Sequence, residues 1–174
     1  TRVVAFIKIL VLARILTPTE FGLFGIAALV LSLLEILTET GINVFLVQLK
    51  EDVSEYVSTA WLVSIVRGVF ISFLIIISAS FVADFFGVPQ AFPLLLLTGF
   101  IPFIRGFINP SEVRFQKELM FKKEFWFRTT LYMADAAIVL VLAFTTRSVM
   151  SLTWGLIISS FLEVVLSFVF IKPH

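Results

Sequence analysis

The stretch RILTPTEFGLFGIAALVLSLLEILTETGINVFLVQ, from Arg14 to Gln48, decides the fold of this chain. It contains the pattern of a capping box: Thr17 can cap a helix, Pro18 suits the first helical position, and Glu20 can reach back to the cap. The sequence therefore predicts that one apolar helix ends near Leu16 and that a second helix begins at Pro18.

The second helix carries a polar stripe. Its members, Ser32, Glu35, Glu39 and Asn43, are spaced i, i+3, i+7 and i+11 and so share one helix face. A carboxylate at the centre of a bilayer costs about 2.5 to 3.5 kcal/mol on insertion scales. We therefore expect Glu35 and Glu39 to face protein or water, where they could bind or exchange a coupling cation.

The composition is that of an integral membrane protein. The 174 residues are 60% hydrophobic and only 14% charged, and the mean hydropathy is +1.10. A net charge of +1 leaves no nucleic-acid footprint. The chain has no Cys, which excludes disulfides and thiolate metal sites, and it has no HExxH, GxSxG or Walker pattern. We expect no enzymatic activity, no cofactor and no metal.

Hydropathy divides residues 1–174 into six candidate spans that form a single transmembrane domain. They are Val3–Leu16, Pro18–Val47 with an interruption near Gly41, Tyr56–Phe85, Ala91–Glu112, Glu124–Thr145 and Met150–Ile171. The first run is short of the roughly 20 residues that a span needs, so we expect the chain to begin within or near its first helix. The connections are short, which predicts antiparallel packing of neighbouring helices in an all-α bundle.

Lys and Arg residues are distributed unequally between the two ends of the predicted bundle. One side has only Arg14 and Arg147, whereas the other has Lys50, Arg114, Lys117, Lys122, Lys123, Arg128 and Lys172. The positive-inside rule then places both chain ends in the cytoplasm. We interpret the Arg114–Arg128 cluster as this topology signal together with contact to anionic lipids, in preference to a substrate site.

Ionisable residues also lie well inside the apolar runs. They are Lys8, Glu35, Glu39, Arg67, Arg105, Asp135 and Glu163. If each faced lipid alone, the combined penalty would approach roughly 20 kcal/mol, more than a folding margin absorbs. We expect them to converge on a polar interior, either as interhelical ion pairs or as a site in which cations meet an anionic substrate and carboxylates take up a coupling ion.

Polar stripes on the later spans support this convergence. The fourth span places Thr98, Arg105, Asn109 and Glu112 on one stripe with Pro102 between them, the fifth aligns Arg128, Tyr132 and Asp135, and the sixth aligns Ser159 or Ser160 with Glu163 and Ser167. Arg67 is followed by Gly68, and Arg105 by Gly106. A neighbouring Gly permits close helix approach, so these two arginines are the favoured candidates for binding a substrate.

Three segments carry a resemblance to a known family. They are ARILTPTEFGLFG (Ala13–Gly25), LTETGINVFLVQ (Leu37–Gln48) and VRFQKELMFKK (Val113–Lys123). Together they resemble the polysaccharide-biosynthesis flippases of the multidrug/oligosaccharidyl-lipid/polysaccharide exporter superfamily. The branch that exports O-antigen and exopolysaccharide units is the most similar one, because it has a basic segment between the fourth and fifth spans.

The resemblance implies two six-helix lobes around a cavity that opens alternately to the two sides of the cytoplasmic membrane. This chain looks like the N-terminal lobe, which would need a C-terminal lobe as its partner. Lys8, Arg67 and Arg105 would then receive the pyrophosphate of a polyprenyl-linked oligosaccharide, while Glu35, Glu39, Asp135 and Glu163 would serve proton or sodium coupling. Two alternatives remain: a cation-coupled multidrug antiporter of the same superfamily, and a non-transporting membrane scaffold held by buried ion pairs.

Overall fold

The computed structural model describes residues 2–39, 41, 48, 54–117 and 119–170. Its regular elements within these ranges are all helical, which confirms the predicted all-α membrane bundle. They are α1 (Arg2–Ile15), α2 (Pro18–Leu37), α4 (Ser54–Phe85), α5 (Ala91–Arg105), the short 3-10 helix η1 (Pro110–Glu112), α6 (Val113–Lys117), α7 (Phe121–Thr146) and α8 (Val149–Phe170).

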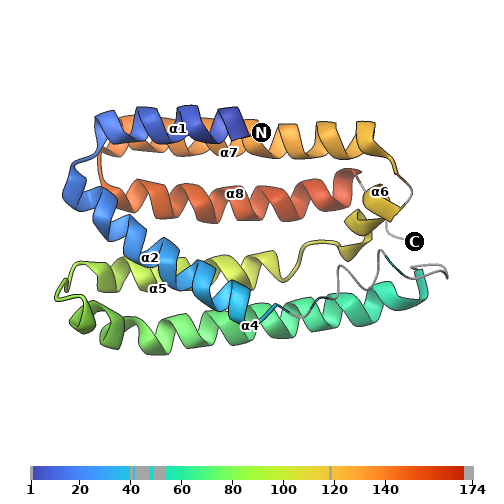
Figure 1. Cartoon of the computed structure of the whole chain (residues 1–174), viewed down its shortest axis with the longest axis horizontal. Coiled ribbons are helices and arrows are strands. Elements are labelled where there is room, and N and C mark those ends of the chain that lie inside the picture. Colours follow the sequence, from blue (N-terminus) through green and yellow to red (C-terminus); the bar gives the residue numbers. More distant parts are fainter. Residues whose placement is uncertain (1, 40, 42–47, 49–53, 118, 171–174) are drawn as a thin grey trace.

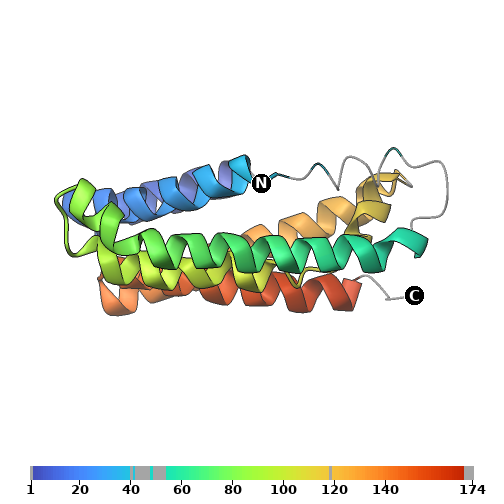
Figure 2. The ribbon, with the colours of Figure 1, turned by 90° about the horizontal axis from the view of Figure 1, so that it is seen from below.

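The long helices run side by side along the long axis of the bundle (Figure 1). α4 packs antiparallel to α5 and α7 antiparallel to α8, and contacts between α5 and α8 join the two pairs. α1 lies on α7, whereas α2 crosses α5 and α8. Both α1 and α2 cover only one half of the bundle's length, as the second view also shows (Figure 2). The last turn of α2 therefore lies midway along the bundle.

Within the described ranges, four helices are long and apolar enough to cross a membrane: α2, α4 from Tyr56 to Phe85, α7 and α8. α5 has 15 residues, which at about 1.5 Å per residue is less than the roughly 30 Å of a hydrocarbon core. Large apolar side chains are exposed along the long helices, for example Phe73, Phe81 and Phe85 on α4. Such surfaces suit contact with lipid, because the acyl chains of a bilayer core are as apolar as these side chains.

The start of α2 is the feature that the sequence predicts most directly. Thr17 Oγ1 accepts a hydrogen bond from the Glu20 backbone N–H at 3.3 Å, and the Thr17 N–H donates to Glu20 Oε2 at 2.9 Å. Pro18 occupies the first helical position. The capping box is thus confirmed, and it satisfies two of the backbone groups that a helix start leaves unpaired.

The end of α2 differs from the predicted second span. The helix ends at Leu37, and Gly41 adopts a left-handed φ of 63°. The interruption expected near Gly41 is confirmed, but it begins earlier than predicted. Glu39 therefore follows the helix as an exposed residue and does not continue the face that bears Glu35. Asn43, the fourth member of the predicted stripe, lies outside the described residues.

The fourth span is also shorter than predicted. α5 ends at Arg105, a turn follows, and Asn109 then caps η1 by accepting a hydrogen bond from the Ser111 N–H at 3.0 Å. The Asn109 N–H donates to Ser167 Oγ on α8 at 3.1 Å. The stripe expected to run from Thr98 to Glu112 on one helix is therefore wrong beyond Arg105, because Asn109 and Pro110 start a new element instead of extending α5.

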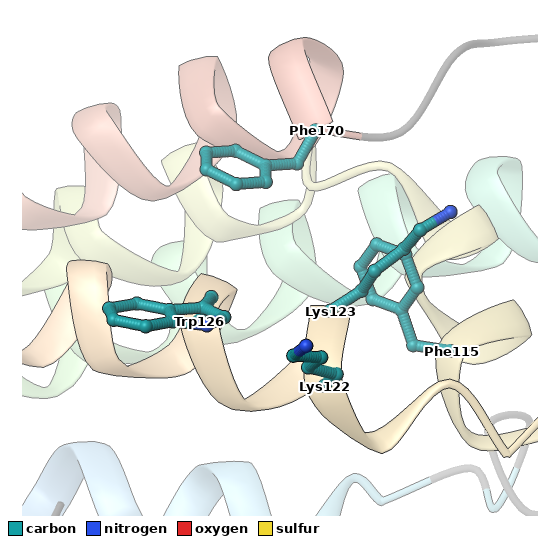
Figure 3. Close-up of a pocket in the computed structure, with 5 residues that line it drawn as sticks. All are labelled: Phe115, Lys122, Lys123, Trp126 and Phe170. Atoms are coloured by element: carbon teal, nitrogen blue, oxygen red, sulfur yellow. The ribbon is translucent and has the colours of Figure 1, made fainter.

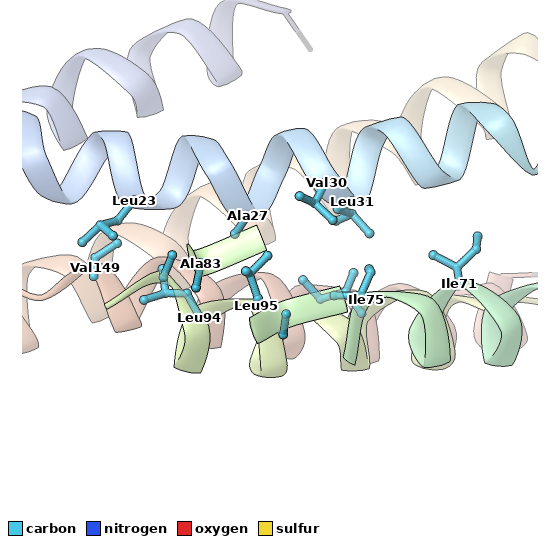
Figure 4. Packing of buried hydrophobic residues seen from close by; sticks show 13 residues of the cluster. Leu23, Ala27, Val30, Leu31, Ile71, Ile75, Ala83, Leu94, Leu95 and Val149 are labelled. Atoms are coloured by element: carbon cyan, nitrogen blue, oxygen red, sulfur yellow. The ribbon is translucent and has the colours of Figure 1, made fainter. Parts of the chain in front are cut away.

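The main apolar core lies between α2, α4 and α5 (Figure 4). Buried side chains from these helices and the start of α8 make up this cluster; they include Leu23, Ala27, Ile75, Leu94, Leu95 and Val149. A second cluster joins α1, α7 and α8 through Leu12, Leu16, Val139, Ala143 and Leu152. The two cores attach α1 and α2 to the bundle of α4, α5, α7 and α8. This packing fixes where the charged residues of α1 and α2 lie.

α4 and α5 approach each other closely where both have a Gly. A Cβ on Gly68 would lie 2.5 Å from the carbonyl oxygen of Pro102 and 3.2 Å from Cα of Gly106. This contact requires Gly, as small residues at membrane helix interfaces often allow close backbone approach. Because Arg67 and Arg105 adjoin these glycines in sequence, the contact brings the two arginine-bearing segments together.

Candidate functional site

Arg105 lies between carboxylates from two other helices. It is the last residue of α5, and its Nη1 is 3.4 Å from Glu35 Oε1 on α2. Its Nε is 3.7 Å from Glu163 Oε2 on α8. One cation therefore bridges three helices, and the apolar packing of α2 and α8 against α5 positions both carboxylates. Arg105, Glu35 and Glu163 together form the Arg105 cluster.

The Arg105 guanidinium has hydrogen-bonding capacity that its two partners do not use. Only the contact with Glu35 meets hydrogen-bond geometry, and Arg105 Nε is buried without a hydrogen-bond partner in the part of the chain that the structure describes. A guanidinium presents five N–H donors in a planar fork. The side chains of Arg105, Glu35 and Glu163 are 39%, 33% and 31% exposed, so a ligand could approach the outer part of the guanidinium, whereas Nε itself is buried.

Arg67 binds the end of α2 beside this cluster. Its Nη2 donates to the Glu35 backbone oxygen at 2.6 Å, and its Nε donates to Thr38 Oγ1 at 3.3 Å. The Thr38 hydroxyl in turn donates to the backbone oxygen of Leu34 at 2.6 Å. Arg67 thus stabilises the carbonyl end of α2, where a cation is favoured by the helix dipole. Glu35 connects the two arginines, one through its backbone and the other through its carboxylate.

Lys8 and Asp135 form a separate and tighter ion pair. Lys8 Nζ on α1 lies 2.6 Å from Asp135 Oδ2 on α7, and their side chains are 19% and 22% exposed. This pair is more buried than the Arg105 cluster and joins the outer helix α1 to the body of the bundle.

Of the seven charges that the sequence places inside apolar runs, six contact partners on other helices: Lys8, Glu35, Arg67, Arg105, Asp135 and Glu163. Glu39 is exposed beyond the end of α2. Ser32, the first residue of the predicted stripe, bonds to backbone oxygens of its own helix, those of Ala28 and Leu29. Which of these residues bind a substrate or a coupling ion stays a prediction.

Sequence reasoning missed the contacts of two residues that shape the site. Thr38 holds Arg67, and Ser167 holds the turn that follows α5. A Thr just after an apolar run can bond to the preceding turn of the helix, so Thr38 carries a weak signal of the helix end. Helical spacing places Ser167 on the same stripe as Glu163, but nothing in the sequence connects it to Asn109.

Fold and charge distribution define this chain as a polytopic helical membrane protein with interhelical ion pairs. The family described as polysaccharide biosynthesis protein matches residues 11–174. The chain belongs to that family. It is also 25% identical over 168 residues to a Klebsiella pneumoniae protein described as an uncharacterized membrane protein in cps region. That match covers 96% of this chain and 35% of the Klebsiella protein, so the chain spans about a third of its relative. No solved structure matches the chain significantly.

Proposed function

We propose that this chain forms one lobe of a flippase that moves polyprenyl-pyrophosphate-linked oligosaccharides across the cytoplasmic membrane for surface polysaccharide synthesis. The observation that carries this proposal is the Arg105 cluster, in which a guanidinium inside the helical bundle lies between two partly exposed carboxylates and its Nε has no hydrogen-bond partner among the described residues. Membership of the polysaccharide biosynthesis family supports an anionic, lipid-linked sugar as the cargo.

Arg105 is the residue best placed to bind the pyrophosphate. Its planar fork matches phosphate oxygens in pairs, and its charge persists at physiological pH. A proton or sodium ion bound at Glu35 or Glu163 would weaken their attraction for Arg105 and free its donors for the cargo. Departure of that ion would restore the ion pairs and favour cargo release, which would couple the two events.

The other two cations would take lesser parts. Lys8 is already neutralised by Asp135 at 2.6 Å, and Arg67 is engaged by backbone and hydroxyl oxygens at the end of α2. We assign Lys8 to holding α1 in place and Arg67 to shaping the end of α2 next to Arg105. Either side chain could still contribute to the positive field that draws an anionic cargo inwards.

A complete flippase of this kind would need a second lobe facing the Arg105 cluster. The Klebsiella relative is about three times as long as this chain, which is compatible with a further helical lobe. Alternating access would then come from movement of one lobe against the other. We place the end of the bundle that bears the α6–α7 turn in the cytoplasm, because Lys and Arg concentrate there.

The test is surface polysaccharide in cells whose own gene for this protein is replaced by variants. Arg105→Lys keeps the charge but loses the paired donors, and Arg105→Ala loses both. We expect the order wild type, Lys, Ala, with a loss of about tenfold or more for Ala, since a charged hydrogen bond contributes about 1.5 to 3 kcal/mol. Arg14→Ala, an exposed cation at the other end of the bundle, is the matched control.

Equal polysaccharide from wild type and Arg105→Ala, at equal abundance in the membrane, would contradict the proposal. Arg67→Ala provides a second comparison. Suppose that Arg105→Ala leaves export unchanged, whereas Arg67→Ala lowers export only as far as it lowers the amount of folded protein. The two arginines would then serve the structure and not cargo binding.

A further inference from the structure

A pocket lies at the other end of α8 from its start, away from the Arg105 cluster (Figure 3). It has a volume of about 240 Å³ and is lined by Phe115 of α6, by Lys122, Lys123 and Trp126 of α7, and by Phe170 of α8. Phe170 follows Glu163 by seven residues, which is about 10 Å along a helix. The pocket is therefore a separate feature, and a ligand bound there does not depend on the proposed flippase activity.

Two lysines contribute positive charge beside this pocket. Lys122 and Lys123 are exposed in the first turn of α7, the end of a helix that already carries partial positive charge. No carboxylate forms an ion pair with either lysine among the described residues. Met120, the residue before α7, offers no side-chain cap to the first N–H groups. Lysines, helix end and missing cap all favour a bound anion.

The remaining walls of the pocket are aromatic. Phe115 and Phe127 are buried with ring centroids 6.0 Å apart, and Phe127 meets Phe170 edge to face at 5.6 Å. These contacts fix the rings of Phe115 and Phe170. Trp126 is 59% exposed and Phe170 is 44% exposed, so both present apolar surface outwards. Aromatic side chains with this mixed exposure are typical of the interface between hydrocarbon and headgroups.

We infer that this pocket binds an anionic phospholipid, with the phosphate on Lys122 and Lys123 and the first carbons of the acyl chains against Phe115, Trp126 and Phe170. The volume is below the roughly 300 to 1,000 Å³ of sites that enclose whole small ligands, so the pocket takes only part of a long molecule. None of the five lining residues is a hydroxyl, amide or carboxylate residue that could bind a sugar. A phospholipid therefore fits better than a lipid-linked oligosaccharide.

Trp126 makes the proposal testable by fluorescence. The purified full protein is reconstituted with brominated phosphatidylglycerol or brominated phosphatidylcholine, and quenching of Trp126 is taken as the difference from Trp126→Phe. We expect phosphatidylglycerol to bind about tenfold or more tightly than phosphatidylcholine, since each lysine near the surface favours anionic lipid by about fivefold. Lys122→Ala with Lys123→Ala should abolish this preference, whereas Arg14→Ala should leave it unchanged.

Three further measurements decide the identity of the ligand. Lys122→Arg with Lys123→Arg keeps both charges and should retain the preference, which separates loss of charge from misfolding. Inorganic phosphate at millimolar concentration should not relieve the quenching, because the lipid chains contribute to binding. Relief by phosphate alone would mean that the pocket binds a free anion and not a phospholipid. Equal quenching by the two lipids would overturn the proposal, and so would displacement of phosphatidylglycerol by an equimolar polyprenyl pyrophosphate, which would make the pocket a cargo site.

Discussion

Arg105 Nε and Glu163 Oε2 lie 3.7 Å apart, close enough for charge attraction but without a hydrogen bond between them. Lys8 Nζ and Asp135 Oδ2, in contrast, form a direct hydrogen-bonded ion pair at 2.6 Å. The two contacts differ in a way that bears on function, because a loose pair can exchange partners at little cost whereas a tight one holds helices together. Each pair therefore leads to its own prediction.

Neutralising the carboxylates of the Arg105 cluster should uncouple transport from its driving ion. Glu35→Gln with Glu163→Gln removes both charges but leaves amide oxygens that can still accept hydrogen bonds from Arg105, so the protein should remain folded while transport loses its dependence on an imposed pH or sodium gradient. The measurement is movement of a labelled lipid-linked oligosaccharide in proteoliposomes of the complete protein. Glu124→Gln is the control, since Glu124 pairs with Arg128 on the same helix. An unchanged gradient dependence would move coupling to Asp135 or Glu39.

Exchanging the charges of Lys8 and Asp135 should test whether that pair is structural. Lys8→Ala or Asp135→Ala alone leaves a charge without its partner. Each should lower the free energy of unfolding by about 2 kcal/mol or more, which is the lower end of the range for breaking a buried ion pair. Lys8→Asp with Asp135→Lys should recover much of that loss. The thermal unfolding midpoint in detergent reports the effect.

The matched comparison for this exchange is the exposed Glu124–Arg128 pair, where single removals should cost about 0.5 kcal/mol or less. Recovery of both stability and export by the Lys8/Asp135 exchange would support a purely structural role for this pair. Recovery of stability without export would instead place Lys8 among the cargo-binding residues.

Close packing of α4 on α5 predicts strong sensitivity at Gly68. A Cβ there would meet the backbone of Pro102 and Gly106, which cannot move aside as a side chain can. We expect Gly68→Ala to cost about 1 to 3 kcal/mol, as overpacking usually does. Gly25→Ala on α2 is the control, since a Cβ at Gly25 has nothing within 4 Å. Equal unfolding midpoints for the two variants would contradict the close contact.

Local signals predict the start of α2, whereas tertiary contacts set several of the other helix ends. The capping box involves Thr17, Pro18 and Glu20 alone, so the sequence contains everything that it needs. The end of α5 depends on Asn109, whose N–H finds its partner on Ser167 of α8. Apolar residues between Arg105 and Asn109 continue the hydropathy of the span, so a hydropathy window extends the helix too far.

The candidate site is predictable as a set of charges but not as a set of pairs. Burial costs alone require Lys8, Arg67, Arg105 and the carboxylates to find partners inside the bundle. Which carboxylate meets which cation depends on how α2 crosses α5 and α8, and no periodicity within one helix contains that information. For this reason helical spacing groups Glu39 with Glu35, although α2 ends between them.

Segregation of the basic residues predicts the orientation of the bundle. Leu119 lies in the turn before α7 and is 67% exposed, and Arg147 lies exposed in the turn between α7 and α8, at the opposite end of α7. Because the chain has no Cys, single Cys residues at these positions can be labelled without background. In intact cells we expect an impermeant maleimide to label Arg147→Cys and to spare Leu119→Cys until the membrane is opened. The reverse pattern would show that the bundle has the opposite orientation, with the pocket lined by Lys122 and Lys123 at the outer leaflet.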